Sequence, residues 1–318
     1  MNDRQFTSAA QGMRSKFSVC IPAYNDLDAF SRCIASVLKQ KDILLECVVN
    51  DDSTTNDIAD YVGSVADARI VYHRNEERLG PVFNWNATIQ RATGEYLTLL
   101  HQDDWYKSEE VLKKIHDIFQ NKEADVLFCG RVLYQDEKYL GEYPMTLKKA
   151  IGFHKGFPSR TLVVNTLGPP SVAFFHQKHK DILYDTALIY FSDTDYYARL
   201  ISSSKKFTVY GEPLVAISRS RNQLSVSCLA RLDTLVPELA HGLRKHNVTS
   251  LEAGLALTRF FAGNMRHWRG ASVVKAFRGV KAEFSLLVRI IAVLSFPVFF
   301  VHMVYRILYR NVTGKAWG

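Results

Sequence analysis

Short apolar runs alternate with segments of helical periodicity between residues 17 and 129. The apolar runs cover residues 17–21, 44–49, 70–72, 96–100 and 126–129. Between them, residues 27–38, 54–62, 82–92 and 109–120 carry apolar side chains three and four positions apart, which is the spacing of one helix face. Strands that alternate with helices form mainly parallel sheets with right-handed crossovers, so the sequence predicts an α/β fold.

Polar clusters follow three of the apolar runs, at residues 24–26, 51–53 and 101–104. Because ligands of open α/β sheets bind outside the carboxyl ends of the strands, we expect a binding site at this edge. Asp103 and Asp104, adjacent after a buried strand, are suited to hold a divalent cation and the phosphates it neutralises. Asp, Asn and Ser are also ordinary loop residues, and the same pair could merely open a turn and cap the next helix.

Two nucleotide-binding patterns are missing from the sequence. It contains neither Gly-x-Gly-x-x-Gly nor a Gly-x-x-x-x-Gly-Lys-Ser/Thr loop. The usual dinucleotide fold and a P-loop enzyme are therefore not indicated. A nucleotide bound at the predicted edge would be held by side chains and a metal.

The charge of the chain is concentrated at one end. The 318 residues carry a formal net charge of +8, and from residue 251 onward ten Lys or Arg face only Glu252 and Glu283. This excess of eight equals the net charge of the chain, so the first 250 residues are neutral. The C-terminal cations share their segment with long apolar runs and do not interleave with single aromatics, which argues against nucleic acid as a partner.

The five cysteines lie far apart, with no Cys-x-x-Cys pair and no His at metal-ligand spacing. They are interpreted as reduced core residues. The N-terminus is polar and lacks a hydrophobic signal region, so a cytoplasmic location is expected, with residues 1–14 flexible.

Four motifs carry a family resemblance. SVCIPAYND (18–26), VVNDDST (48–54), NEERLGPVFNWNATIQRATGEYLTLLHQDD (75–104) and FSDTDYYARL (191–200) occur in this order. Together they resemble the family 2 glycosyltransferases, over about residues 17–225. The resemblance implies a GT-A fold, a nucleotide-diphosphate-sugar donor, a saccharide or lipid-linked acceptor, and transfer with inversion.

The resemblance also implies a nucleotide site. It places Pro22, Ala23, Tyr24, Asn25 and Asp26 around the base and ribose, with Asp51 hydrogen-bonding the base. In the third motif it implies that Asp103 binds Mg²⁺ or Mn²⁺, while His101 contacts ribose or phosphate and Gln102 lies beside them. The chain departs from the family pattern at Asn50, Asp52 and His101, where relatives have Asp, Gly and Asp.

The fourth motif resembles the family's catalytic carboxylate motif, with Asp193 as the general base and Ser192 where relatives often have Glu. Ser192 and Asp195 have the spacing of a capping box, which gives Asp195 a structural role. The resemblance further implies acceptor-sugar or diphosphate contacts from Gly168, Pro170, Ser171, Arg219 and Arg221. The two arginines could equally be surface cations. Asp104 is open to an acceptor contact, or to a supporting role either beside the metal ligand or at the start of the next helix.

The C-terminal segment 284–309 is strongly apolar. Between Arg289 and Arg306 lie sixteen residues of which only His302 ionises near neutral pH, with Pro297 near the middle. A spanning helix needs about 20 apolar residues, so a broken or in-plane helix at the inner face of the cell membrane is favoured. The alternative is a helix packed on the catalytic domain. The expected domains are a GT-A catalytic domain over 15–228 and a helical, membrane-associating region over 229–318.

The sequence therefore predicts a metal-dependent, inverting glycosyltransferase with peripheral membrane contact. The alternative, from another functional class, is a catalytically silent nucleotide-sugar-binding scaffold at the membrane.

Overall fold

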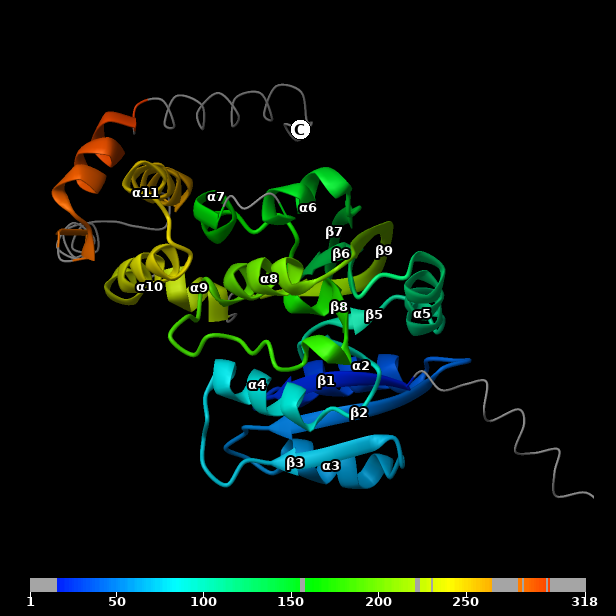
Figure 1. Ribbon diagram of the computed structural model, residues 1–318. Coiled ribbons are helices and arrows are strands. Elements are labelled where there is room, and N and C mark those ends of the chain that lie inside the picture. The colour runs from blue at the N-terminus through cyan, green and yellow to red at the C-terminus, as the bar shows by residue number, and fades with distance from the viewer. Residues whose placement is uncertain are drawn as a thin grey trace, which may run out of the picture. The chain divides into compact units, whose positions relative to one another are not determined.

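The computed structural model (Figure 1) describes residues 16–154, 158–220, 224–229, 231–264, 280–281, 283–295 and 297. The expected flexible stretch 1–14 lies outside these residues. Internal contacts divide the chain into two compact units. The sheet unit comprises Met1–His154, Thr166–Thr186 and Arg199–Ser220, and the helical unit comprises Lys155–Asn165, Ala187–Ala198 and Arg221–Gly318. The helical unit thus includes two segments that precede residue 228, the predicted end of the catalytic domain.

The sheet unit is built on a nine-stranded sheet with the order β3-β2-β1-β4-β8-β6-β9-β5, and β7 pairs with β6. The strands are β1 (Lys16–Ala23), β2 (Leu44–Asp51), β3 (Ile70–Arg74), β4 (Tyr96–Leu99), β5 (Trp105–Tyr106), β6 (Val126–Gln135), β7 (Lys138–Tyr143), β8 (Ala173–His176) and β9 (Phe207–Arg219). Strands β1 to β4 form a parallel block, and β6 runs parallel to β9. The mostly parallel sheet confirms the predicted fold class.

The register of the parallel block brings its carboxyl ends together. Pro22 pairs with Asn50 and Ala23 with Asp51, while Cys20 lies opposite Leu99 near the end of β4. The polar residues that follow β1, β2 and β4 therefore meet at one edge of the sheet, as the sequence predicts.

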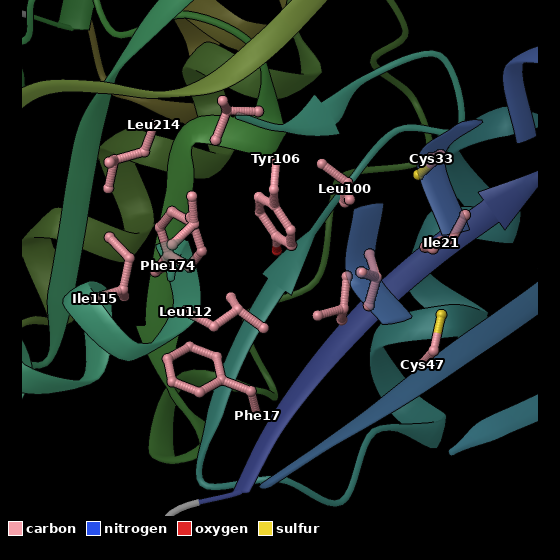
Figure 2. Packing of buried hydrophobic residues seen from close by; sticks show 14 of the residues in the cluster. Phe17, Ile21, Cys33, Cys47, Leu100, Tyr106, Leu112, Ile115, Phe174 and Leu214 are labelled. Carbon is pink, nitrogen blue, oxygen red and sulfur yellow. The ribbon is translucent and has the colours of Figure 1, made fainter. Parts of the chain in front are cut away.

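Helices cover both faces of this block: α2 (Leu27–Leu38), α3 (Asp57–Val65), α4 (Pro81–Arg91) and α5 (Val111–Lys122). Because side chains alternate along a strand, Phe17, Val19 and Ile21 of β1 share one buried cluster with the apolar residues of α2 and α5. Figure 2 shows Tyr106 and Phe174 directed into the same cluster. Cys20 points the other way, and its Sγ lies 3.8 Å from the carbonyl oxygen of Thr88 in α4.

A buried carboxylate, that of Glu46, links β2 to the first residues of β1 and to the loop before β4. Glu46 on β2 is 5% exposed and accepts hydrogen bonds from the Ser18 hydroxyl and from the Thr93 backbone N–H, the latter at 2.6 Å. It also forms an ion pair with Lys16. Although burial opposes ionisation, these donors lower the pKa of Glu46 to about 2. The charged form of Glu46 therefore stabilises the fold.

The helical unit contains α7 (Pro158–Val163), the start of α8 (Ser192–Ser203), α9 (Leu224–Leu229), α10 (Leu232–Lys245) and α11 (Ser250–Asn264). Its core joins Phe191 to apolar side chains of α10 and α11 such as Leu239, Leu257 and Phe260. A further helical stretch covers residues 286–295. Among the described residues, no helix is both long and apolar enough to cross a membrane.

The remaining elements are α6 (Leu147–His154) and two 3₁₀ turns, η1 (Pro170–Val172) and η2 (Gln177–His179). The five cysteines are reduced and buried, as expected. Burial raises the pKa of the thiols of Cys20, Cys33, Cys47 and Cys129, so these side chains are neutral core residues.

Candidate functional site

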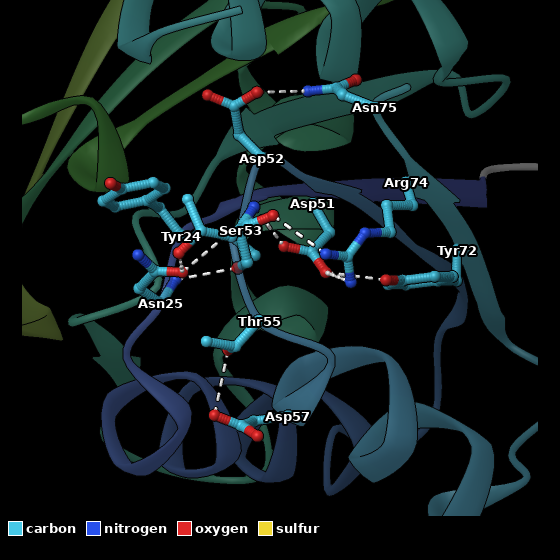
Figure 3. A network of polar contacts seen from close by, with 12 residues as sticks. Tyr24, Asn25, Asp51, Asp52, Ser53, Thr55, Asp57, Tyr72, Arg74 and Asn75 are labelled. Atoms are coloured by element: carbon cyan, nitrogen blue, oxygen red, sulfur yellow. Dashed lines mark hydrogen bonds and ion pairs between the residues drawn. The ribbon is translucent and has the colours of Figure 1, made fainter. Parts of the chain in front are cut away.

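Asp51 ends β2 with a fully buried carboxylate. Its Oδ2 accepts a hydrogen bond from the Tyr72 hydroxyl at 2.7 Å, and its Oδ1 accepts the backbone N–H of Ser53 at 2.9 Å. Arg74 Nη1 lies 3.8 Å from Oδ2 (Figure 3). These contacts fix the carboxylate at the edge of the sheet where the sequence predicts a nucleobase contact.

The loop after β1 is tied to the loops after β4 and β2. The side chain of Gln102 accepts the backbone N–H of Tyr24 at 2.7 Å and donates to the Tyr24 carbonyl at 2.8 Å. Asn25, at φ 51°, accepts the backbone N–H of Thr54 through its Oδ1 at 2.8 Å. The Tyr24 ring is 38% exposed and is covered by the Arg78 guanidinium at 4.7 Å. The exposed aromatic ring is therefore held at the rim of the predicted nucleotide site.

The other three residues predicted around the base and ribose lie deeper or cap a helix. Pro22 and Ala23 are buried members of β1. Asp26 is the N-cap of α2, with its Oδ1 accepting the Ala29 N–H at 3.0 Å. Their positions set the path of the loop.

Asp52 supports the site from a buried position to which the sequence assigned no role. It is 5% exposed and accepts hydrogen bonds from Asn75 Nδ2 and from the backbone N–H groups of Leu79 and Gly80, at 2.7 to 2.9 Å. Gly80 has φ 81°, which favours glycine, and it is the N-cap of α4. Asp52 therefore shapes the loop that leads from β3 into α4. The sequence signals were its place in the polar cluster 51–53 and its replacement of the Gly that relatives have there.

A candidate metal-binding cluster follows β4. His101, Asp103 and Asp104 each offer one ligand atom, and these atoms lie within 4.8 Å of one another. The His101 ring packs on Trp85 with a centroid distance of 5.1 Å. Burial lowers the pKa of His101 and keeps its imidazole neutral, and its buried Nε2 has no hydrogen-bond partner among the described residues. Carboxylate oxygens and a neutral imidazole nitrogen are ligands that a divalent cation accepts, and the structure brings His101 close to the predicted ligand Asp103.

Hydrogen bonds from Ser171 and Ser218 fix the position of Asp104 in this cluster. The Ser171 hydroxyl donates to Asp104 Oδ2 and accepts the His101 backbone N–H at 3.1 Å, while Asp104 Oδ1 accepts the Ser218 N–H at 3.1 Å. Asp104 is 2% exposed and Ser171 is fully buried. Burial, with a further contribution from the neighbouring Asp103, raises the pKa of Asp104 well above its ordinary value. The supporting role considered for Asp104 is the one that its contacts describe.

The remaining sugar or diphosphate candidates are scattered. Pro170 is buried at the start of η1, and Gly168 has φ 108°, with the Arg131 guanidinium 2.6 Å from where a Cβ would lie. Arg219 is exposed at the end of β9. Arg221 lies outside the described residues.

In the helical unit, α8 begins with two carboxylates in contrasting surroundings. Asp195 is fully buried and pairs with Lys245 Nζ and His246 Nε2, each at 3.0 Å. Asp193 Oδ1 is also buried but has no hydrogen-bond partner among the described residues. Burial raises the pKa of Asp193 to about 7, and a hydrogen bond from Ser192 only partly opposes this shift. Asp195 is thus paired with the Lys245 ammonium and the His246 ring, whereas Asp193 can exchange a proton near neutral pH.

Comparison with known proteins finds similarity over the part of the chain that contains the strand ends described above. The family model described as glycosyl transferase family 2 matches residues 18–183. UDP-Glc:α-D-GlcNAc-diphosphoundecaprenol β-1,3-glucosyltransferase WfaP of Escherichia coli is 30% identical over 121 residues, which cover 38% of this chain and 47% of that protein. The match thus spans about half the length of WfaP.

Two solved structures have a similar fold at low sequence identity. S. aureus TarS 1–349 in complex with UDP-GlcNAc has a TM-score of 0.60 at 15% identity, covering 95% of this chain and 93% of that chain. The mannosyltransferase PcManGT from Pyrobaculum calidifontis, in complex with GDP-Man and Mn²⁺, has a TM-score of 0.51 at 14% identity, covering 95% and 88%. These likenesses confirm the predicted fold. With the family model matching more than half of its residues, this chain belongs to glycosyl transferase family 2.

Proposed function

We propose that the protein transfers a sugar from a nucleoside-diphosphate sugar to a saccharide carried on a lipid, with the help of a divalent cation. The observation that carries this proposal is the edge where β1, β2 and β4 end. Asp51 ends β2 at this edge, and Tyr24 follows β1. The side chain of Gln102 accepts the Tyr24 N–H, and Gln102 directly precedes Asp103 of the candidate metal-binding cluster. Nucleoside-diphosphate sugars are present in both solved neighbours, which supports this donor class.

The proposed donor contacts follow from the chemistry of the edge. Asp51 suits a base N–H, since a carboxylate is an acceptor, and the Tyr24 ring suits the face of the base. Asp103, with His101 beside it, would hold Mg²⁺ or Mn²⁺. The bound cation would neutralise charge on the diphosphate as it leaves.

Asp193 is the proposed general base. An inverting single displacement forms one bond from the acceptor oxygen to the anomeric carbon and breaks the bond from that carbon to the diphosphate. The acceptor hydroxyl proton passes to the base in the same step. A carboxylate with a pKa of about 7 accepts a proton more readily than an ordinary Asp and is still ionised above neutral pH.

A lipid-linked acceptor agrees with an exposed apolar face in the helical unit. On the stretch 286–295, Leu286, Leu287, Ile290, Val293 and Leu294 are 46% to 73% exposed. The opposite side packs inward, since Ile291 lies against Gly254 and the Ala292 carbonyl accepts the Thr258 hydroxyl. The cations that follow residue 251 would favour the anionic inner face of the cell membrane. WfaP acts on a diphosphoundecaprenol-linked sugar, which supports this acceptor class.

Vesicle flotation tests the membrane contact. The double variant Leu287→Gln/Leu294→Gln should lose most binding to vesicles that contain phosphatidylglycerol, because each apolar side chain contributes on the order of 1 kcal/mol or more. Leu147→Gln, which changes a side chain 53% exposed in the sheet unit, is the matched control. Equal flotation of both variants and the wild type would remove this face from the proposal.

The function itself is tested with a panel of nucleotide sugars and an extract of lipid-linked saccharides. Release of nucleoside diphosphate together with a labelled lipid product supports the proposal. Tight donor binding without release or transfer would favour the alternative, a silent nucleotide-sugar-binding scaffold.

A further inference from the structure

A hollow of about 200 Å³ lies in the sheet unit beside the candidate metal-binding cluster. Four elements line it: the start of α2, β5, the turn between β6 and β7, and the end of β9. Trp105 in its wall directly follows Asp104, and Ser218 in its wall donates its N–H to Asp104 Oδ1. Residues of the hollow are therefore next to Asp104 in sequence or hydrogen-bonded to it, and Asp104 belongs to the candidate metal-binding cluster at which sugar transfer is proposed.

The wall combines an aromatic surface with a stacked guanidinium. The rings of Trp105 and Tyr134 lie 5.1 Å apart, and the Arg32 guanidinium lies 4.3 Å from the Trp105 ring. Arg32 Nε is buried and has no hydrogen-bond partner among the described residues. A buried N–H group without a hydrogen-bond partner destabilises the folded protein, and a ligand oxygen that accepts a hydrogen bond from it would remove this cost.

The charge of the lining selects against phosphate. Asp26, Asp28, Asp136 and Glu137 provide four carboxyl groups against the two guanidinium groups of Arg32 and Arg219. Placing like charges together costs several kcal/mol, so a diphosphate is a poor occupant. A neutral sugar suits the lining, because its hydroxyls donate to carboxylates and accept from Arg32 while its C–H face packs on aromatic rings. Pockets for drug-sized ligands measure about 300–1,000 Å³, so the hollow has room for about one sugar ring.

We propose that this hollow binds the terminal, uncharged sugar residue of the acceptor, with Tyr134 and the carboxylates of the β6–β7 turn as its specificity-determining contacts. This inference rests on the proposed function and adds the acceptor end of it. Asp136 and Glu137 adopt φ 47° and 66° in a tight turn, so their side chains are presented from a fixed backbone.

Saturation-transfer NMR with methyl glycosides of glucose, galactose and N-acetylglucosamine, in the presence of UDP and Mn²⁺, tests the proposal. The wild type should bind at least one glycoside. Tyr134→Ala should weaken that binding by about tenfold or more, and the near-isosteric pair Asp136→Asn/Glu137→Gln by about threefold or more. Tyr143→Ala, which changes an exposed ring of β7 outside the lining, is the control and should bind as the wild type does.

Glycoside binding that is absent from the wild type, or unchanged in both hollow variants, would overturn the proposal. UDP binding, followed in the same samples, reports on the donor site independently. Failure of the acceptor inference is then distinguishable from failure of the proposed function, since the first leaves UDP binding intact and the second abolishes it in the wild type.

Discussion

Replacing Asp193 by Asn should increase stability relative to the wild type as pH rises, and it should lower turnover by orders of magnitude. Burial raises the pKa of this carboxyl from 3.8 to about 7 in the folded protein. The pKa of Asp193 is higher in the folded protein than in the unfolded chain. The protonated carboxyl therefore makes its full contribution to the free energy of unfolding below about pH 4. This contribution is lost as pH rises through about 7.

The magnitude follows from the size of the shift. Between pH 5 and pH 7 the folded protein keeps a proton that the unfolded chain has released, and each pH unit corresponds to about 1.4 kcal/mol. The wild type should therefore lose about 2 kcal/mol by pH 7 and about 3 kcal/mol by pH 8.5 through Asp193 alone. The dipole of α8 favours the charged form at its first turn by about 0.3–1 kcal/mol, so a net effect of about 2 kcal/mol is expected.

Urea unfolding of wild type and Asp193→Asn at pH 5 and pH 8.5 measures this difference. The stability of the variant relative to the wild type should increase by about 2 kcal/mol between the two pH values. Asp181→Asn, which removes the same charge from an exposed position, is the control and should show no such increase. Turnover of Asp193→Asn should fall by about 10²–10⁴-fold with donor affinity retained. A stability difference independent of pH would refute the desolvation argument, and wild-type turnover in the variant would refute the base assignment.

Three further predictions concern the framework. Glu46→Gln should destabilise the protein by about 3 kcal/mol at pH 7 and by about 1 kcal/mol at pH 3, because the wild-type carboxylate with its pKa of about 2 loses its contribution as pH falls; urea unfolding at both pH values checks this. Lys245→Met should cost about 1–3 kcal/mol, because buried Asp195 keeps His246 but loses the ammonium group of Lys245, and adding Asp195→Leu should restore most of the lost thermal stability. Gly94→Ala should cost about 1–3 kcal/mol, because the new Cβ would lie 2.6 Å from the Lys16 carbonyl oxygen, whereas Gly63→Ala, with nothing within 4 Å, should be neutral or stabilising in the same melting experiment.

The fold was predictable where local pattern and tertiary structure agree. The run at residues 96–100 ends in polar residues because β4 passes from the core to the edge of the sheet, and the structure has this strand at Tyr96–Leu99. The helix predicted from residue 54 begins at Asp57, since residues 53–56 serve the loop around Asp51 and Asn25. The long strand β9 was not predicted, because Gly211 and Pro213 interrupt its apolar pattern. Its register shifts against β6 near Gly130, which absorbs the interruption.

The side chains of the candidate site that follow strands were predictable from the sequence, whereas the hydrogen bonds that support them were not. Asp51 and Asp103 follow apolar runs, so sequence position alone puts them at the edge. The hydrogen bond from Ser171 to Asp104 joins residues 67 positions apart, and the pair of bonds between Tyr24 and Gln102 joins residues 78 apart. No local periodicity encodes such partners. The burial that raises the pKa of Asp193 likewise depends on its packing in the helical unit, which a helix-start motif does not reveal.

The binding of UDP and GDP in the presence and absence of Mn²⁺, measured by calorimetry on the wild type and Asp103→Ala, tests the central claim most directly. The account predicts that the wild type binds at least one of the two nucleotides, with an affinity at least tenfold higher in Mn²⁺ than in EDTA. It also predicts that Asp103→Ala, still folded, loses this difference. Nucleotide binding that is indifferent to Mn²⁺ in the wild type, or equally dependent on Mn²⁺ in Asp103→Ala, would contradict it.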